Sequence, residues 1–196
     1  MGTAGPQSNK ARFERITLEK NNSRSMNIIT WRTITWQQFG AAIDMLDNAL
    51  RACPDHLWRE SLWNDPTDAP EYTEFWFIVY HSLFWLDLCL SGSREGFAPP
   101  PPFVAGSLPE KPYTKDELQA YLDHCRQKCQ ATIEALIDEK ANQRCKFPWC
   151  EEVSFAELQL YSMRHVQEHA SQLSLLLGQK VGSAPDWVPR TESRAA

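Results

Sequence analysis

Four segments of the sequence repeat apolar residues at spacings of three and four, the pattern of one face of an α-helix. This periodicity constrains the fold most, because such helices must bury their apolar faces against one another. The first segment begins after Thr35, a residue type that caps helices, and Pro54 ends it. The second covers about residues 71–90 and ends before Ser91 and Gly92. We therefore expect an all-α protein.

Two capping boxes mark the beginnings of the other two helices. The pattern Ser/Thr-x-x-Glu occurs at residues 114–117 and again at 154–157. The apolar period continues after each box, which predicts helices over about 115–142 and 155–177. Gly178 is expected to end the last helix.

The link between the second and third predicted helices, residues 91–114, is long and carries four consecutive prolines at 99–102. At about 3.3 Å per residue it could reach back along a helix of about 30 Å, so that these two helices run parallel. We therefore expect a four-helix bundle of the up-down-down-up type with a long Pro-rich crossover. The prolines could instead be a polyproline ligand, but stiffening of the loop is the simpler interpretation.

Residues 1–25 are polar and aperiodic, which predicts a disordered N-terminal tail. The bundle is expected over residues 26–180, followed by a C-terminal tail over 181–196. Met26 opens the region of regular pattern and is a candidate natural start.

Composition excludes several classes of protein. The net charge is −5 and no basic stripe is present, so nucleic acid is not an expected partner. Residues 1–25 lack the apolar core of a signal peptide, which predicts a cytoplasmic protein whose six cysteines are reduced. The longest apolar run, residues 75–90, is too short to span a membrane and contains Asp87. Because this run is apolar nearly all round, we expect a homodimer through it or a neighbouring helix.

Two histidines lie four residues apart in the last predicted helix. At about 100° per residue His165 and His169 lie about 40° apart, with Leu158 and Leu176 between them, so both are predicted in the middle of the apolar stripe. On the second helix His81 is also predicted to face inward. Buried imidazoles need partners: other hydrogen bonds, a buried water or a metal ion. Three of them can bind a divalent transition metal and leave one coordination position open.

The sequence resembles the DinB/YfiT-like metalloenzyme superfamily. The resemblance lies in "EFWFIVYHSLFWLDLCL" (74–90), in "ELQLYSMRHVQEHASQL" (157–173) and in the long link between the second and third helices. The superfamily pattern of one histidine on the second helix and HxxxH on the fourth carries over to the metal ligands His81, His165 and His169. A glutamine that often follows in the family matches Gln172.

This resemblance implies a function as well as a fold. Members are four-helix bundles, often dimers, that bind zinc, nickel or a similar ion. It implies a metal-dependent thiol S-transferase, in which the metal holds a low-molecular-weight thiol such as bacillithiol, mycothiol or glutathione as its thiolate. The expected partner is therefore a small-molecule substrate, while no catalytic side chain is identified. The alternatives are a metal-dependent hydrolase and a non-enzymatic, stress-related bundle with a structural metal site.

Other candidate residues have simpler interpretations. Four cysteines, Cys125, Cys129, Cys145 and Cys150, could form a structural zinc site, but their spacings are looser than usual and small core residues are the favoured interpretation. His56 and His124 fall outside the apolar pattern and are expected at the surface or its edge. Glu74 could orient His81, and Glu168 could orient a ligand or act as a base near the metal, although solvated charges are the favoured interpretation. Three aromatic residues either line a pocket or fill the core: Tyr80, Trp85 and Tyr161.

Overall fold

The computed structural model describes residues 31–105 and 108–192, and this part of the chain is mainly helical, as the sequence predicts. The N-terminal helix is helical over the described residues 31–52. Two short 3-10 helices follow, η1 (Asp55–Leu57) and η2 (Pro70–Thr73). The remaining elements are α2 (Phe75–Ser91), α3 (Lys115–Glu134), α4 (Asp138–Asn142), β1 (Arg144–Phe147), β2 (Cys150–Ser154) and α5 (Phe155–Val181). The predicted tail over 1–25 and Met26 lie outside the described residues.

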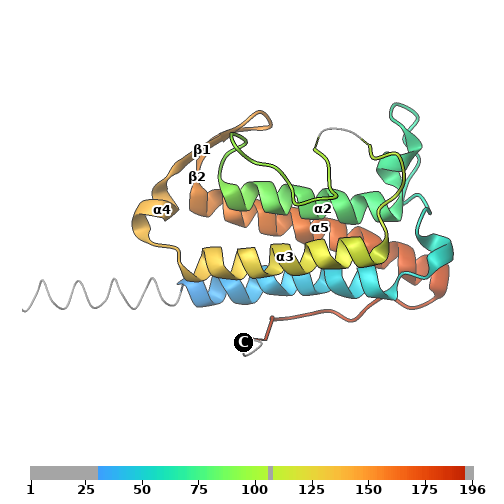
Figure 1. Ribbon diagram of the computed structural model, residues 1–196. Coiled ribbons are helices and arrows are strands. Elements are labelled where there is room, and N and C mark those ends of the chain that lie inside the picture. Colours follow the sequence, from blue (N-terminus) through green and yellow to red (C-terminus); the bar gives the residue numbers. More distant parts are fainter. Residues whose placement is uncertain (1–30, 106–107, 193–196) are drawn as a thin grey trace, which may run out of the picture.

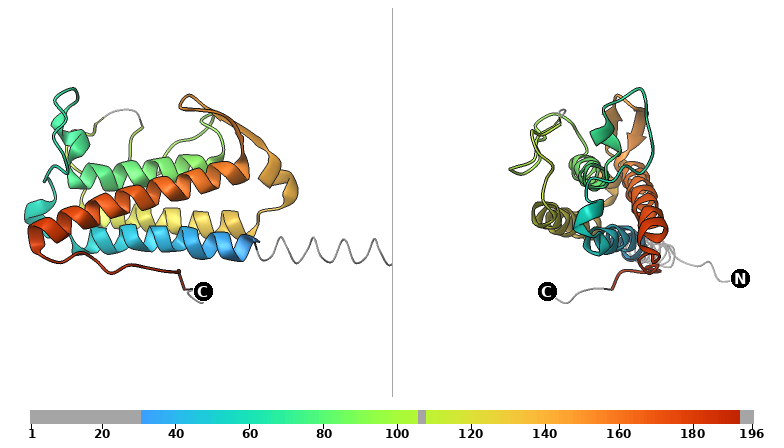
Figure 2. Two further views of the ribbon diagram at one scale, coloured as in Figure 1. Left: turned by 180° about the vertical axis from the view of Figure 1, so that it is seen from behind. Right: turned by 90° about the vertical axis from the view of Figure 1, so that its right-hand side faces the viewer.

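The N-terminal helix, α2, α3 and α5 lie side by side, and the end-on view of Figure 2 shows them around a common core. In Figure 1 the colours show that the chain runs one way along α2 and α3 and the other way along the N-terminal helix and α5. Among the described helices, α2 contacts both α3 and α5. It therefore lies between the helix that carries two cysteines and the helix that carries two histidines.

The N-terminal helix buries the face that its sequence predicts. Trp36, Phe39 and Ile43 point into the core, with Leu46 and Leu50 on the same stripe. The prediction that Thr35 caps this helix is wrong, because residues 31–34 are already helical and Thr35 is buried. The sequence did not indicate this, because it does not distinguish a threonine within a helix from a threonine at the N-cap.

Helix α2 begins later than predicted. Residues 70–73 form η2, and Glu74 is the extended N-cap of α2. At the other end Gly92 adopts the left-handed conformation that favours glycine and closes the helix. Thirteen of the 17 residues of α2 are buried within this one chain. The apolar surface that motivated the homodimer prediction is therefore largely covered without a partner.

The capping box at Thr114 and Glu117 is present and opens α3, as predicted. The predicted end of this helix, near Asn142, is wrong. Helix α3 stops at Glu134, and the backbone is extended at Ile137 before α4 begins. The break inserts Leu136 into a second apolar cluster, beneath the hairpin that follows, and burial of this side chain outweighs the lost helical turn.

A β-hairpin was not predicted in the short link before α5. Strands β1 and β2 pair antiparallel and have an irregular register between Cys145 and Phe147. Both of these residues are buried, and the hairpin arches over the end of the helices in Figure 1. The pairing of only a few residues leaves too short a period to recognise in the sequence.

Helix α5 begins at the predicted place, where the Ser154 side chain accepts a hydrogen bond from the Glu157 backbone N–H. Its predicted end at Leu177–Gly178 is wrong. Gly178 lies within the helix, which continues to Val181 and ends at Gly182 in the left-handed conformation. A single glycine inside a helix costs only about 1 kcal/mol, so it did not mark the end.

The Pro-rich segment between α2 and α3 is anchored by aromatic rings. Phe103 is buried and stacks on Tyr121 of α3 and on Tyr80 of α2, with ring centroids 4.4 and 6.0 Å apart. The Tyr113 hydroxyl accepts a hydrogen bond from the Val104 backbone N–H at 3.1 Å. The segment is thereby held against both helices that it connects.

The described part of the C-terminal segment packs against the N-terminal helix, as Figure 1 shows. Thr191 is buried, and its hydroxyl bonds to Asp44 and to Arg126 of α3. A side chain at Gly40 would collide with Thr191, because a Cβ there would lie 2.3 Å from the threonine methyl carbon. Gly40 therefore permits this close contact.

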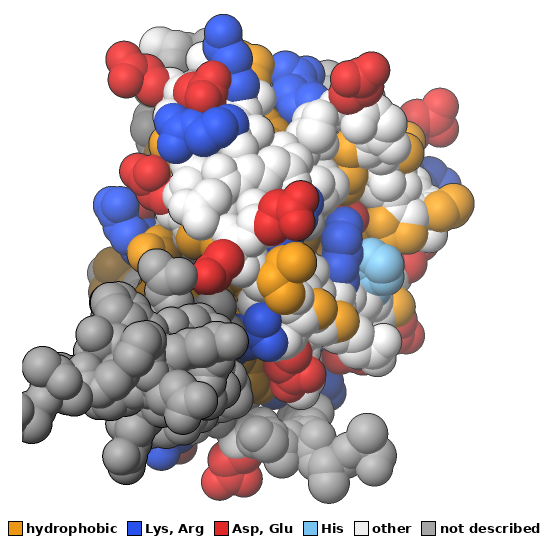
Figure 3. Space-filling model, turned by 90° about the vertical axis from the view of Figure 1, so that its left-hand side faces the viewer, with side chains coloured by type: hydrophobic (Ala, Val, Ile, Leu, Met, Phe, Trp, Pro, Cys, Tyr) orange, Lys and Arg blue, Asp and Glu red, His pale blue; other side chains and the backbone are white. Residues whose placement is uncertain are grey.

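Acidic and basic side chains are mixed over the face of the molecule drawn in Figure 3. None of the helices within the described residues has both the length and the apolar content that crossing a membrane requires.

Candidate metal centre

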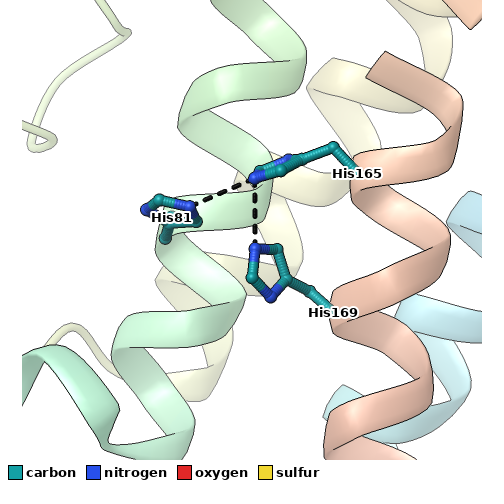
Figure 4. Close-up of side chains that lie close together, drawn as sticks. All are labelled: His81, His165 and His169. Carbon is teal, nitrogen blue, oxygen red and sulfur yellow. Dashed lines mark hydrogen bonds between the residues drawn. The ribbon is translucent and has the colours of Figure 1, made fainter. Parts of the chain in front are cut away.

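Three histidine side chains meet between α2 and α5. Figure 4 shows that His81 comes from α2, whereas His165 and His169 come from successive turns of α5. The Nε2 atom of His165 lies 3.2 Å from that of His81 and 3.1 Å from that of His169. One nitrogen from each ring lies within 4.8 Å of the other two, the one such group of potential ligands among the described residues. The structure thus brings together all three predicted ligands.

Their depth differs from the prediction. The buried face of α5 is centred on Ser162, Val166 and Leu173, and both histidines lie at its edge, half-buried. The helical wheel erred because it was centred on the histidines themselves, with Leu158 and Leu176 close to them. The edge position leaves the rings accessible from one side.

Gln172 orients one of the rings. The Nδ1 atom of His169 lies 2.8 Å from Oε1 of Gln172, one helical turn further along α5. An amide oxygen only accepts, so Nδ1 of His169 carries the hydrogen and Nε2 presents its lone pair to the centre. A second hydrogen-bonding group commonly fixes a metal-binding histidine in this way.

Trp85 contacts the other side of the cluster. Its indole N–H donates to Nδ1 of His81 at 3.2 Å. An indole nitrogen has no acceptor function, so Nδ1 of His81 is unprotonated and the neutral ring carries its hydrogen on Nε2. His81 therefore directs an N–H toward His165, whereas His169 directs a lone pair toward it.

These two assignments leave the neutral cluster unsatisfied. If Nε2 of His165 is unprotonated, it faces the lone pair of His169; if it is protonated, it faces the N–H of His81. One of the two short contacts is therefore unfavourable in either tautomer. This conflict disappears when a cation occupies the centre and all three rings offer lone pairs.

Burial resists protonation of the same rings. Loss of solvent lowers the pKa of His81 to about 3, with a further contribution from the neighbouring imidazoles. Burial, with His169 beside it, lowers the pKa of His165 to about 4, and burial also lowers that of His169. At neutral pH the three imidazoles are thus neutral, the form in which histidine binds metal ions.

The donor set fits a divalent transition ion. Tetrahedral coordination at about 2.0–2.1 Å places ligand atoms about 3.3 Å apart, close to the two short distances in the cluster. Three neutral nitrogen ligands suit zinc, nickel, copper, cobalt and iron, and do not select among them. Binding through Nε2 of His81 requires a hydrogen on Nδ1, so the Trp85 indole would then have to move from its present contact.

A cavity of about 280 Å³ borders the cluster. His81 and His165 form part of its wall, together with Trp85 and Cys89 of α2, Tyr161 and Ser162 of α5 and Trp149 from the hairpin. Trp85 and Tyr161 thus line a pocket as predicted, while Trp149, Ser162 and Cys89 were missed. Only the unexpected hairpin brings Trp149 here, and no sequence pattern indicates this contact.

The fold agrees with comparison to known proteins. The sequence profile of the DinB superfamily matches residues 38–173, which is more than half of the chain. The chain belongs to the DinB superfamily. Its fold is similar to the crystal structure of a DinB-like protein from Bacillus subtilis, with 13% sequence identity and a TM-score of 0.51. The alignment covers 83% of this chain and 98% of that one. No curated protein gives a significant sequence match.

Two acidic residues of this DinB-superfamily chain do not take the roles considered for them. The Glu74 carboxylate accepts hydrogen bonds from Arg59 and from the indole of Trp76 at the beginning of α2. Glu168 is exposed and lines a different hollow with Arg164, and its charge only partly offsets the lowering of the His169 pKa by burial. The histidine-orienting partners are instead Gln172 and Trp85, and both are uncharged.

The remaining candidates are not part of the cluster. Cys125, Cys129 and Cys145 are buried, and the described residues contain no metal-binding group of cysteines. Cys150 is a strand residue in the hairpin. His56 and His124 are exposed, as predicted. Tyr80 packs against Phe103 and Tyr113 in the core and also lines a second hollow, with His81 and Trp85, as predicted.

Proposed function

We propose that this protein holds a divalent transition-metal ion, zinc or nickel, through His81, His165 and His169, and that it is a metal-dependent thiol S-transferase. The observation that carries this proposal is the cavity beside the cluster. His81 and His165 form part of its wall, so an ion held there would face a space large enough for a substrate. Family membership is consistent with it.

The side chains of this chain have separate roles in the proposal. A bound divalent cation would lower the pKa of a thiol so that the thiolate is available at neutral pH. The three imidazoles would hold the ion, and Gln172 would keep the His169 ring in the correct tautomer. The aromatic walls, Trp85, Trp149 and Tyr161, would exclude water from the thiolate and from its acceptor.

Two alternatives use the same three ligands. A metal-dependent hydrolase would use the cavity for water and a hydrolysable substrate. A structural metal site in a stress-related bundle would need no cavity at all. The cavity therefore favours an enzyme, and activity with thiols separates the transferase from the hydrolase.

The proposal extends to the architecture and the assembly. We propose a four-helix bundle over about residues 26–180, with up-down-down-up order and a Pro-rich crossover between α2 and α3. The chain directions visible in Figure 1 support this order. A cytoplasmic homodimer is also proposed. Three exposed apolar residues on α5, Leu160, Leu175 and Val181, offer a surface for it, and sedimentation at micromolar concentration tests it.

Metal analysis followed by a thiol screen tests the function. The protein should be purified without nickel resin or chelator, because either would change its metal content. We expect about one divalent ion per chain. The metal-loaded protein should accelerate the reaction of glutathione, bacillithiol or mycothiol with monobromobimane, and chelator treatment should abolish the acceleration.

A matched variant controls for loss of fold. His56→Ala removes an exposed histidine far from the cluster in sequence and should retain metal and activity. Equal metal content in His56→Ala and His165→Ala would contradict the site. A full metal content without activity toward any thiol would contradict the transferase and favour the alternatives.

A further inference from the structure

The cavity beside the histidines changes character from its mouth to its floor. At the mouth, Tyr161 and Trp149 are 41% and 37% exposed, so the cavity opens to solvent between two aromatic rings. At the floor, Ser162 and Cys89 are each 1% exposed. A ligand that enters would therefore pass from the exposed aromatic rings to a buried end that contains the Ser162 hydroxyl.

Ser162 is unpartnered at that floor. Its hydroxyl makes no hydrogen bond to any residue that the structure describes, although nearly all of the side chain is buried. Leaving such a group unpaired costs about 1–3 kcal/mol. Ser162 lies one helical turn before His165, so a ligand group bonded to this hydroxyl would sit next to the histidine cluster.

The walls favour a flat, uncharged ring. Trp85 and Trp149 meet edge to face, with ring centroids 4.5 Å apart, and Tyr161 also lines the cavity. Aromatic rings prefer offset or edge-to-face contact with other aromatic rings. Among the described residues that line the cavity, none is Asp, Glu, Lys or Arg, so in the metal-free protein a buried ligand charge would have no counter-charge. In the metal-loaded protein the thiolate would balance the charge of the ion.

We infer that this cavity binds a small, uncharged aromatic molecule of one or two rings that carries a hydroxyl or carbonyl group. Its ring would lie among Trp85, Trp149 and Tyr161, and its oxygen would bond to Ser162. The volume of about 280 Å³ is at the lower end of small-molecule sites, which limits the ligand to this size. Its role as the second substrate, beside the thiol, rests on the proposed function.

Calorimetric titration of the full-length protein tests the inference, with 2-naphthol as the probe. Two matched compounds separate the features: 2-naphthoate adds a charge, and decahydro-2-naphthol removes the aromatic rings. In chelator-treated protein we expect 2-naphthol to bind at least about tenfold more tightly than either, because charge burial and loss of aromatic contact each cost more than 1.4 kcal/mol. Equal affinities, or no binding of 2-naphthol, would overturn the inference.

Three variants locate the bound probe. Ser162→Ala should weaken 2-naphthol about fivefold, the equivalent of one hydrogen bond, and leave 2-methylnaphthalene unchanged. Trp149→Ala should weaken both probes. Trp187→Ala is the control, because Trp187 is 67% exposed and lines a different hollow. An equal loss in Ser162→Ala for both probes, or a loss in Trp187→Ala, would contradict the assignment.

The titration is repeated on chelator-treated protein, so that its outcome does not depend on the metal or on activity. Binding of 2-naphthol to a protein that takes up no metal would contradict the proposed function alone. A metal-loaded, thiol-dependent enzyme that does not bind 2-naphthol would contradict this inference alone.

Discussion

Two pairs of side chains in this protein have the same spacing and opposite surroundings. His165 and His169 lie four residues apart on α5, and Cys125 and Cys129 lie four residues apart on α3. Both pairs consist of residue types that bind metals. The histidines are half-buried, meet a third imidazole and border a cavity. The cysteines have no exposed surface and lie in the apolar core.

The difference originates in the helix that faces each pair. Helix α2 lies against both α3 and α5. Toward α5 it presents His81, which completes the nitrogen cluster. Toward α3 it presents mostly apolar side chains and the Leu83 carbonyl, which accepts a weak hydrogen bond from the Cys125 thiol at 3.6 Å. It also presents Asp87, whose carboxylate accepts hydrogen bonds from Tyr121 and Lys128 of α3. Burial raises the pKa of both thiols, so neither is a ready thiolate. The pair on α5 thus meets a third nitrogen ligand, whereas the carboxylate that α2 directs at α3 is already bonded to Tyr121 and Lys128.

Loss of one histidine should produce the largest difference between the two pairs. We expect His165→Ala to reduce the metal content from about one ion per chain to below about a tenth, because two ligands rarely hold a transition ion. Cys129→Ala, the matched change in the other pair, should retain the full content. Elemental analysis of both proteins measures this, and circular dichroism confirms that each is folded. Loss of metal in Cys129→Ala would break the comparison.

The hydrogen bond from His169 to Gln172 should matter nearly as much. Gln172→Leu should weaken metal affinity about 10- to 100-fold, because the ring loses the partner that fixes its tautomer. Competition with a chromogenic chelator measures the affinity. Gln167→Leu, on the same helix but bonded to Ser171, is the control and should change it little. Similar losses of metal affinity in the two variants would mean that the losses come from a weakened helix and not from the His169 tautomer.

The cysteines should instead report on packing. Cys129→Ala should lower the free energy of unfolding by about 1–1.5 kcal/mol, the usual cost of deleting one buried heavy atom. Urea denaturation measures this change. In the folded protein both thiols should resist iodoacetamide, since the reagent needs an accessible thiolate. Rapid labelling of Cys125 or Cys129 under native conditions would contradict their description as core residues.

Trp85 should oppose metal binding. Its N–H stabilises the His81 tautomer that has hydrogen on Nε2, whereas coordination through Nε2 requires hydrogen on Nδ1. Trp85→Phe keeps an aromatic ring and removes this donor, so metal affinity should rise about fivefold, the equivalent of one hydrogen bond. The same chelator competition tests it. An unchanged affinity would contradict this opposing role, and a lower one would show that Trp85 favours binding.

Acid should destabilise the metal-free protein slightly through the histidines. Their folded pKa values, about 3 for His81 and about 4 for His165, lie below the unfolded value of about 6.5. Above pH 6.5 both histidines are neutral in the folded and in the unfolded protein, so they cause no loss of stability. As the pH falls from about 6.5 to about 4, only the unfolded state gains protons, so stability decreases.

For these partly solvated rings we expect His81→Gln to reduce that decrease by about 1 kcal/mol at most. Urea denaturation of chelator-treated protein at pH 7 and pH 4.5 measures it. His56→Gln, at an exposed position, should leave the decrease unchanged. An equal acid sensitivity of wild type and His81→Gln would contradict the burial of this ring.

The sequence predicted those parts of the fold that depend on local chemistry. The capping box at Thr114 lies where it was expected, and so does the beginning of α5 after Ser154. It failed where a tertiary contact overrides a local preference. The turn at Ala135 exists because Leu136 is buried in the second apolar cluster. Gly178 lies inside α5, because one glycine costs a helix only about 1 kcal/mol and the helix continues to Val181. Thr35 lies within a helix that is already formed at residue 31, the first residue that the structure describes.

For the candidate site, the sequence by itself determined the three histidines, because their residue type, spacing and family pattern are written in the chain. Only the tertiary structure decided that they lie at the edge of the core, and that Trp85 and Gln172 impose opposite tautomers on them. It also decided that Trp149 of the hairpin packs edge to face on Trp85, and that both rings line a cavity. The periodicity of a helix shows which face a residue is on, whereas a cavity depends on what the opposite elements leave unfilled.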